Sequence, residues 1–140
     1  MLLEEFEDVA AVIEPTEKPV HDKGEVCETI ILSFNGEILK RLIESEEVYP
    51  GGYLKSINGQ HPWYIYDQGT SKLAVMLAPI GAPMIVGQLE KLVARGFKNF
   101  IILGSCGVLD RSIEADKIIL PAAALRDEGT SYHYAPPGDE

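Results

Sequence analysis

Residues Phe100-Ile101-Ile102-Leu103-Gly104-Ser105-Cys106-Gly107 decide how the fold of this chain is interpreted. Four consecutive apolar residues without alternation are typical of a buried strand that is covered on both faces, as in a parallel sheet between layers of helices. The two glycines argue against a helix and predict a loop directly after the strand. Ligands of open α/β sheets bind just beyond the carboxyl ends of the strands, so residues 104–107 are a candidate ligand loop. A tight turn without a ligand is the alternative.

The residues before this stretch predict a βαβ unit. Residues 73–77 form a second continuous apolar run, and Pro83 suits the first position of a helix, where the N–H that proline lacks would have no partner. Gly96 is a natural helix end. Strand, helix and strand in immediate succession indicate a right-handed crossover and hence a parallel sheet. The apolar stripe of the predicted helix consists of Ile85, Leu89, Leu92 and Val93.

The flanking segments complete an α/β pattern. Residues 29–32 predict a strand, and Asn35 is a plausible N-cap of the helix that follows it. Residues 49–52 predict a break, and residues 53–57 and 63–66 predict two antiparallel strands around Asn58-Gly59. Residues 118–121 predict one more strand. We therefore expect an N-terminal arm over residues 1–24 and a single α/β domain over residues 25–140.

Composition narrows the function classes. The 140 residues are 46% hydrophobic and 24% charged, which is ordinary for one soluble domain. The net charge of −10 disfavours nucleic acid and anionic membranes as partners. No apolar window is as long as a membrane span, and the acidic N-terminus does not resemble a signal peptide, so we expect a cytoplasmic protein. The two cysteines and three histidines are scattered, and we expect no metal site.

Four motifs, in this order along the chain, resemble the nucleoside phosphorylase family that includes uridine phosphorylase and the hexameric purine nucleoside phosphorylases. They are Ile80-Gly81-Ala82-Pro83, Gly104-Ser105-Cys106-Gly107, Asp116-Lys117-Ile118-Ile119-Leu120-Pro121 and Arg126-Asp127-Glu128-Gly129-Thr130-Ser131-Tyr132-His133-Tyr134. The resemblance begins near Thr29 and covers only the N-terminal half of the family domain. It implies a three-layer α/β/α sandwich around a twisted mixed sheet.

The resemblance also implies a reaction and a site. Family members cleave the N-glycosidic bond of a nucleoside with phosphate as co-substrate and need no other cofactor. Gly104 and Ser105 match the phosphate-binding loop, while Ile80, Cys106 and Gly107 match residues beside the sugar and base. Catalytic residues are not identified. The charged segment 126–128 is expected to form a turn, with catalytic carboxylates as the alternative.

Departures from the family pattern predict a degraded phosphate site. Ile102 stands where the family has an arginine three residues before the loop serine, and residues 32–38 and 49–52 lack the family's other arginines. A phosphate site without guanidinium groups loses its strongest charge-assisted hydrogen bonds. The alternative function is a non-catalytic ligand-binding or dimerisation module derived from the family, and a more distant one is a thiol hydrolase built on Cys106 and His133. The half domain is expected to form a homo-oligomer, because a sheet edge and a helix face would be uncovered.

Overall fold

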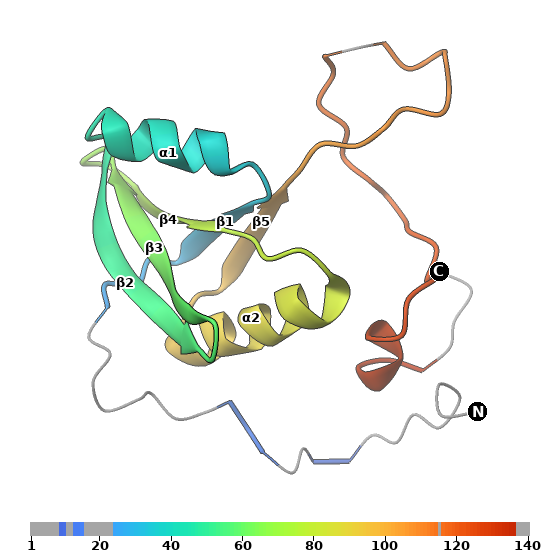
Figure 1. Ribbon diagram of the computed structural model, residues 1–140, viewed down its shortest axis with the longest axis horizontal. Helices are drawn as coiled ribbons and strands as arrows, with labels where there is room; N and C mark the ends of the chain where they lie inside the picture. Colours follow the sequence, from blue (N-terminus) through green and yellow to red (C-terminus); the bar gives the residue numbers. More distant parts are fainter. Residues whose placement is uncertain (1–8, 11–12, 16–23, 115, 137–140) are drawn as a thin grey trace. The chain divides into compact units, whose positions relative to one another are not determined.

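The computed structural model describes residues 9–10, 13–15, 24–114 and 116–136 (Figure 1). Most of the predicted arm at residues 1–24 lies outside the described residues. The chain divides into two compact units, with the boundary between Ser105 and Cys106. Each unit is therefore described by itself.

The first unit contains one mixed sheet of five strands in the order β2-β3-β4-β1-β5. The strands are β1 (Thr29–Ser33), β2 (Val48–Ser56), β3 (Gly59–Asp67), β4 (Lys72–Leu77) and β5 (Asn99–Leu103). β1 lies parallel to both β4 and β5, whereas β3 is antiparallel to β2 and to β4. The carboxyl ends of the parallel strands β4, β1 and β5 therefore lie side by side, at the same end of the sheet.

Two helices lie on opposite faces of this sheet (Figure 1). α1 (Gly36–Glu44) begins directly after β1, and its N-cap Asn35 accepts a hydrogen bond from the Glu37 N–H at 3.0 Å. α2 (Ala82–Arg95) has Pro83 in its first turn and ends at Gly96, whose φ of 105° is left-handed. The α/β/α arrangement around a mixed sheet, as predicted, is confirmed.

The core lies between α2 and the sheet. Ile30 and Leu32 of β1 belong to it, while Ile31 between them does not, as the alternation of a strand requires. Trp63 is fully buried at its centre, where the indole meets the ring of Phe97 edge to face at a centroid distance of 5.7 Å. The Trp63 Nε1–H donates to the Glu25 carbonyl at 2.8 Å, so the one polar atom of the indole is paired.

Three local predictions were wrong. β5 is a strand, but it lies at the edge of the sheet, since no further strand among the described residues pairs with it, and Ile101, Ile102 and Leu103 are each about half exposed. Residues 118–121 form no strand, since no neighbouring backbone pairs with them in the described part of the chain. Residues 49–52 do not break the chain but lie within β2, where a bulge between Pro50 and Gly52 absorbs the irregularity.

Candidate functional site at the carboxyl ends of the parallel strands

Backbone hydrogen bonds bring the ends of three strands together. The Ala78 N–H, just after β4, donates to the Ser33 carbonyl at 2.8 Å. The Phe34 N–H, just after β1, donates to the Leu103 carbonyl of β5 at 2.9 Å. The loops that follow β1, β4 and β5 therefore start side by side, which is where ligands bind in open α/β sheets.

The predicted site residues of this unit are Ile80, Gly104 and Ser105, and all three are exposed. Ile80 leaves 89% of its surface accessible on the loop between β4 and α2. A Cβ atom at Gly104 would stand 3.3 Å from Cδ2 of Phe34, so the lack of a side chain lets the β1 loop approach the backbone of β5 closely. The structure thus places the three residues on the loops after β4 and β5, on either side of the loop after β1, without enclosing them.

At the carboxyl ends of β1, β4 and β5, an anion would be bound by backbone N–H groups and hydroxyl groups. The N-terminus of α2 contributes little, because the Met84 and Ile85 N–H groups already donate to the Gly81 carbonyl at 3.1 Å and Pro83 has no N–H. The N-terminus of α1 is capped by Asn35. Ile102, at the position of the family arginine, presents a half-exposed hydrocarbon side chain. Any anion here would depend on the Gly104–Ser105 segment.

Cys106 and Gly107 belong to the second unit and are exposed. Within the described residues, no hydrogen bond links the Cys106 thiol to the His133 imidazole; the backbone N–H of His133 donates to the Thr130 carbonyl at 3.0 Å. The structure therefore does not provide the thiol–imidazole pair that a cysteine hydrolase requires.

The charged segment 126–128 is irregular, with a bend that begins at Glu128, and the side chains of Arg126 and Glu128 bond to nearby backbone groups. Glu128 accepts hydrogen bonds from the Thr130 N–H at 2.7 Å and the Ser131 N–H at 3.0 Å, and the hydrogen bonds from Ser131 are the main reason that the pKa of Glu128 is lowered. Arg126 binds the Ser131 hydroxyl and the carbonyls of Ala135 and Pro136. These groups hold the bend that precedes the 3₁₀ helix at Ser131–His133.

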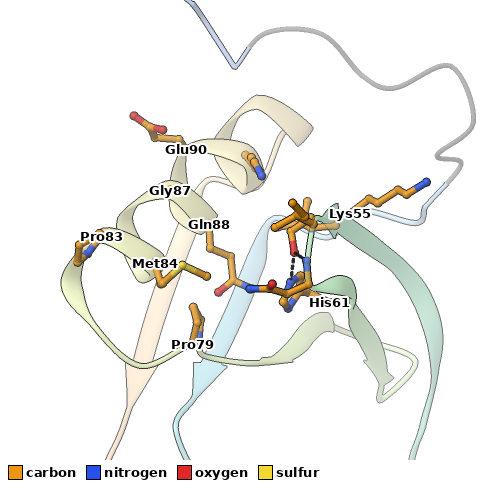
Figure 2. A pocket seen from close by; sticks show the side chains of 13 residues that line it. Lys55, His61, Pro79, Pro83, Met84, Gly87, Gln88 and Glu90 are labelled. Carbon is orange, nitrogen blue, oxygen red and sulfur yellow. Dashed lines mark hydrogen bonds between the residues drawn. The ribbon is translucent and has the colours of Figure 1, made fainter.

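The sequence interpretation missed a pocket between the β2–β3 hairpin and α2 (Figure 2). None of the predicted site residues lines it. The signal that would have indicated it is Gln88, an amide in the apolar stripe three residues after Ile85 and one before Leu89. The residues that line the pocket are Leu54, Lys55, Ser56, Ile57, Asn58, His61, Pro79, Pro83, Met84, Gly87, Gln88, Glu90 and Lys91.

Two features are absent from the described residues: a metal-binding cluster and a membrane-spanning helix. Among these residues, no three His, Cys, Asp or Glu side chains are arranged so that they could hold a metal ion. Within the same residues, neither helix has the length and apolar character needed to cross a bilayer.

Comparison with known proteins agrees with the fold. The sequence profile of the Phosphorylase superfamily matches residues 28–140. A uridine phosphorylase of Treponema pallidum is 33% identical over 81 residues, which is 56% of this chain and 31% of that protein. A guanosine phosphorylase of Halorubrum lacusprofundi is 28% identical over 117 residues, which is 81% of this chain and 46% of that protein.

A uridine phosphorylase of Thermococcus kodakarensis is 39% identical over 62 residues, covering 44% of this chain and 22% of that protein. The chain thus spans less than half the length of these relatives. No solved structure matches it significantly. The profile match covers most of the chain, and the five-stranded mixed sheet agrees with the expected fold: the chain belongs to the phosphorylase superfamily.

Proposed function

We propose that the chain binds a purine or pyrimidine nucleoside at the carboxyl edge of β1, β4 and β5 and takes part in cleavage of its N-glycosidic bond. The observation that carries the proposal is the pair of backbone hydrogen bonds, Ala78 to Ser33 and Phe34 to Leu103, that gathers the three loops. Gly104 and Ser105 would bind the anion, and Ile80, Cys106 and Gly107 would lie beside the sugar and base.

The reaction sets what the site must do. In phosphorolysis, a phosphate oxygen forms a bond to the anomeric carbon while the carbon–nitrogen bond breaks. The bonding electrons leave with the base, which then takes up a proton. Donors that face the incoming anion and the departing base lower the barrier, because charge develops at both places. The backbone and hydroxyl of Ser105 supply donors on the anion side.

The alternative is a non-catalytic module that binds a nucleoside or dimerises. The observation that favours it is Ile102, because a half-exposed hydrocarbon stands where the family has a guanidinium. Without that cation, phosphate is bound by weaker hydrogen bonds to neutral groups.

A base-release assay separates these functions. The purified chain is incubated with uridine, inosine, guanosine or methylthioadenosine, with and without phosphate, and free base is measured by chromatography. Release that depends on phosphate supports phosphorolysis, and release without it supports hydrolysis. Absence of release together with binding by calorimetry supports the module, and absence of both contradicts the nucleoside site.

Two variants locate the activity. Ser105→Ala removes the loop hydroxyl and is expected to lower release or binding about tenfold, a loss equivalent to about 1.4 kcal/mol. Ser71→Ala is the matched control, because Ser71 is also exposed but lies in the turn before β4. Equal effects of the two substitutions would contradict the placement of the site.

We also propose that the protein acts as a homo-oligomer. The support is the free edge of β5, where Ile101, Ile102 and Leu103 are each about half exposed. An apolar edge strand with unpaired backbone groups favours association. Sedimentation equilibrium that shows a monomer at all concentrations would contradict this proposal.

A further inference from the structure

The pocket between the β2–β3 hairpin and α2 has a volume of about 300 Å³, enough for a small ring-shaped molecule. It lies within the first unit, and Ile80, Gly104 and Ser105 do not line it, whereas Pro79 and Pro83, on either side of Ile80, do. Figure 2 shows the Gln88 side chain reaching from α2 toward the hairpin, where His61 lies.

Gln88 carries an unused hydrogen-bond acceptor. The residue is only 7% exposed, and its Nε2 contacts the Met76 Sδ at 3.2 Å. Its Oε1 is buried and has no hydrogen-bond partner among the described residues. Buried carbonyl oxygens in folded proteins are nearly always paired, because removal from water without a partner is destabilising. A ligand with an N–H or O–H group would satisfy this oxygen.

His61 and Ser56 form a second polar group on the hairpin side of the pocket. The Ser56 Oγ lies 2.8 Å from the His61 Nε2 and accepts the Asn58 N–H at 3.1 Å. Either the hydroxyl or the ring nitrogen donates in this contact, depending on the His61 tautomer.

The walls between these two polar groups are mainly apolar, formed by Leu54, Pro79, Pro83, Met84 and Gly87. An anion would place another oxygen against the unpaired oxygen of Gln88, and the cations at the rim, Lys55 and Lys91, are exposed to water that screens them. The pocket chemistry therefore favours a neutral, flat molecule that carries a hydrogen-bond donor.

We propose that this pocket binds a small neutral cyclic amide or imide, whose N–H donates to Gln88 Oε1 while its ring packs on the apolar wall. This proposal does not depend on the proposed nucleoside site, whose residues Ile80, Gly104 and Ser105 do not line the pocket.

A matched pair of probes tests the proposal in the unaltered protein. 2-Pyridone carries the required N–H beside a carbonyl, and N-methyl-2-pyridone differs by a methyl group on that nitrogen. Each is titrated into ¹⁵N-labelled protein. We expect saturable shifts of the Gln88 side-chain amide with 2-pyridone and at least tenfold weaker binding of the methylated probe. Equal affinity, or no saturable shift with 2-pyridone, would overturn the proposal.

A variant pair provides the second test. Gln88→Leu removes the acceptor and keeps an apolar side chain in the stripe, so it should lose 2-pyridone binding at least tenfold while unfolding at an equal or higher temperature. Gln60→Leu, at an exposed hairpin position outside the pocket lining, should bind 2-pyridone like the original protein. Unchanged affinity in a folded Gln88→Leu protein contradicts the site, and if that variant does not fold, the two probes still decide.

A second copy of the chain is the competing occupant. If the Gln88 amide signal shifts on dilution of the ligand-free protein, the pocket is closed by self-association and the proposal fails. Base release by Ser105→Ala stays a separate measurement, so failure at one site is distinguishable from failure at the other.

Discussion

Gly51 lies directly against the indole of Trp63, and a Cβ atom at this glycine would stand 2.6 Å from Nε1. Real side chains do not approach so closely, so β2 can pass over the buried tryptophan only with glycine at this position. The same holds for Gly52, the Trp63 partner in the β2–β3 register. The hairpin that carries His61 thus depends on its packing against the core.

Gly51→Ala should destabilise the protein. The new methyl group must displace the indole or the strand, and overpacking of this kind costs about 1–3 kcal/mol. The measurement is chemical denaturation followed by fluorescence of Trp63, the single tryptophan of the chain. Gly87→Ala is the control, because nothing lies within 4 Å of a Cβ in the middle of α2. It should stabilise by about 0.5–1 kcal/mol, as expected for glycine replaced in a helix. Equal destabilisation by both would contradict the packing argument.

Asn35→Ala should weaken the start of α1. The Asn35 Oδ1 accepts the Glu37 N–H at 3.0 Å, and loss of an N-cap side chain costs about 1 kcal/mol. Asn35→Asp keeps the acceptor and is expected to change the free energy of unfolding by less than half as much. Thermal unfolding of the three proteins measures the difference, and identical stability of the alanine variant would show that the cap is not used.

Stability at acid pH should depend on Asp67. Its pKa is lowered, first by the hydrogen bond from the Gly69 N–H at 2.8 Å and then by Lys72, whose Nζ lies 2.9 Å from Oδ2. A lowered pKa in the folded state stabilises above the unfolded value, near 3.8, and this stabilisation is lost as pH falls through the folded value. Asp67→Asn should therefore lose less stability than the original protein between about pH 5 and 2.

The control for the Asp67 prediction is a double-mutant cycle with Lys72→Met. In the Lys72→Met protein, the pH-dependent stabilisation due to the ion pair disappears, and the stabilisation due to the Gly69 hydrogen bond stays. Denaturation midpoints across the pH series give both parts. Parallel pH curves for Asp67→Asn and the original protein would rule out this role of the carboxylate.

Ile102→Arg should strengthen phosphate binding, since it supplies a guanidinium at the position of the family arginine. A charge-assisted hydrogen bond contributes about 1.5–3 kcal/mol, so affinity for phosphate is expected to rise roughly ten- to a hundredfold. Ile101→Arg is the matched control, because adjacent residues of β5 point to opposite faces and both isoleucines are about half exposed. Calorimetric titration with phosphate compares the two. A stronger effect at Ile101 would place the anion on the other face.

Local sequence patterns were sufficient for most of the fold. Continuous apolar runs at β1, β4 and β5, the cap at Asn35 and the stop at Gly96 are features of a few neighbouring residues, and the structure confirms each. The edge position of β5 was not predictable in this way. Whether Ile102 is covered depends on how many strands and helices surround it, which its immediate neighbours do not encode.

The two candidate sites also differ in whether local sequence patterns predict them. The strand–loop pattern predicts the loops at Ile80 and Gly104, and the structure shows that they follow β4 and β5, the two strands that flank β1. The pocket at Gln88 requires the hairpin to pack near α2, so His61 and Gln88 meet only through tertiary structure. An amide within an apolar helical stripe is the one local sign of it.

The most direct test of the nucleoside site is an amide map of ¹⁵N-labelled protein titrated with inosine and uridine. The account predicts that the largest saturable shifts occur at Ile80, Gly104 and Ser105, with Asp67 and Asn99, at the opposite end of the sheet, unchanged. Saturable shifts confined to other surfaces, or no saturable shift with either nucleoside, would contradict it.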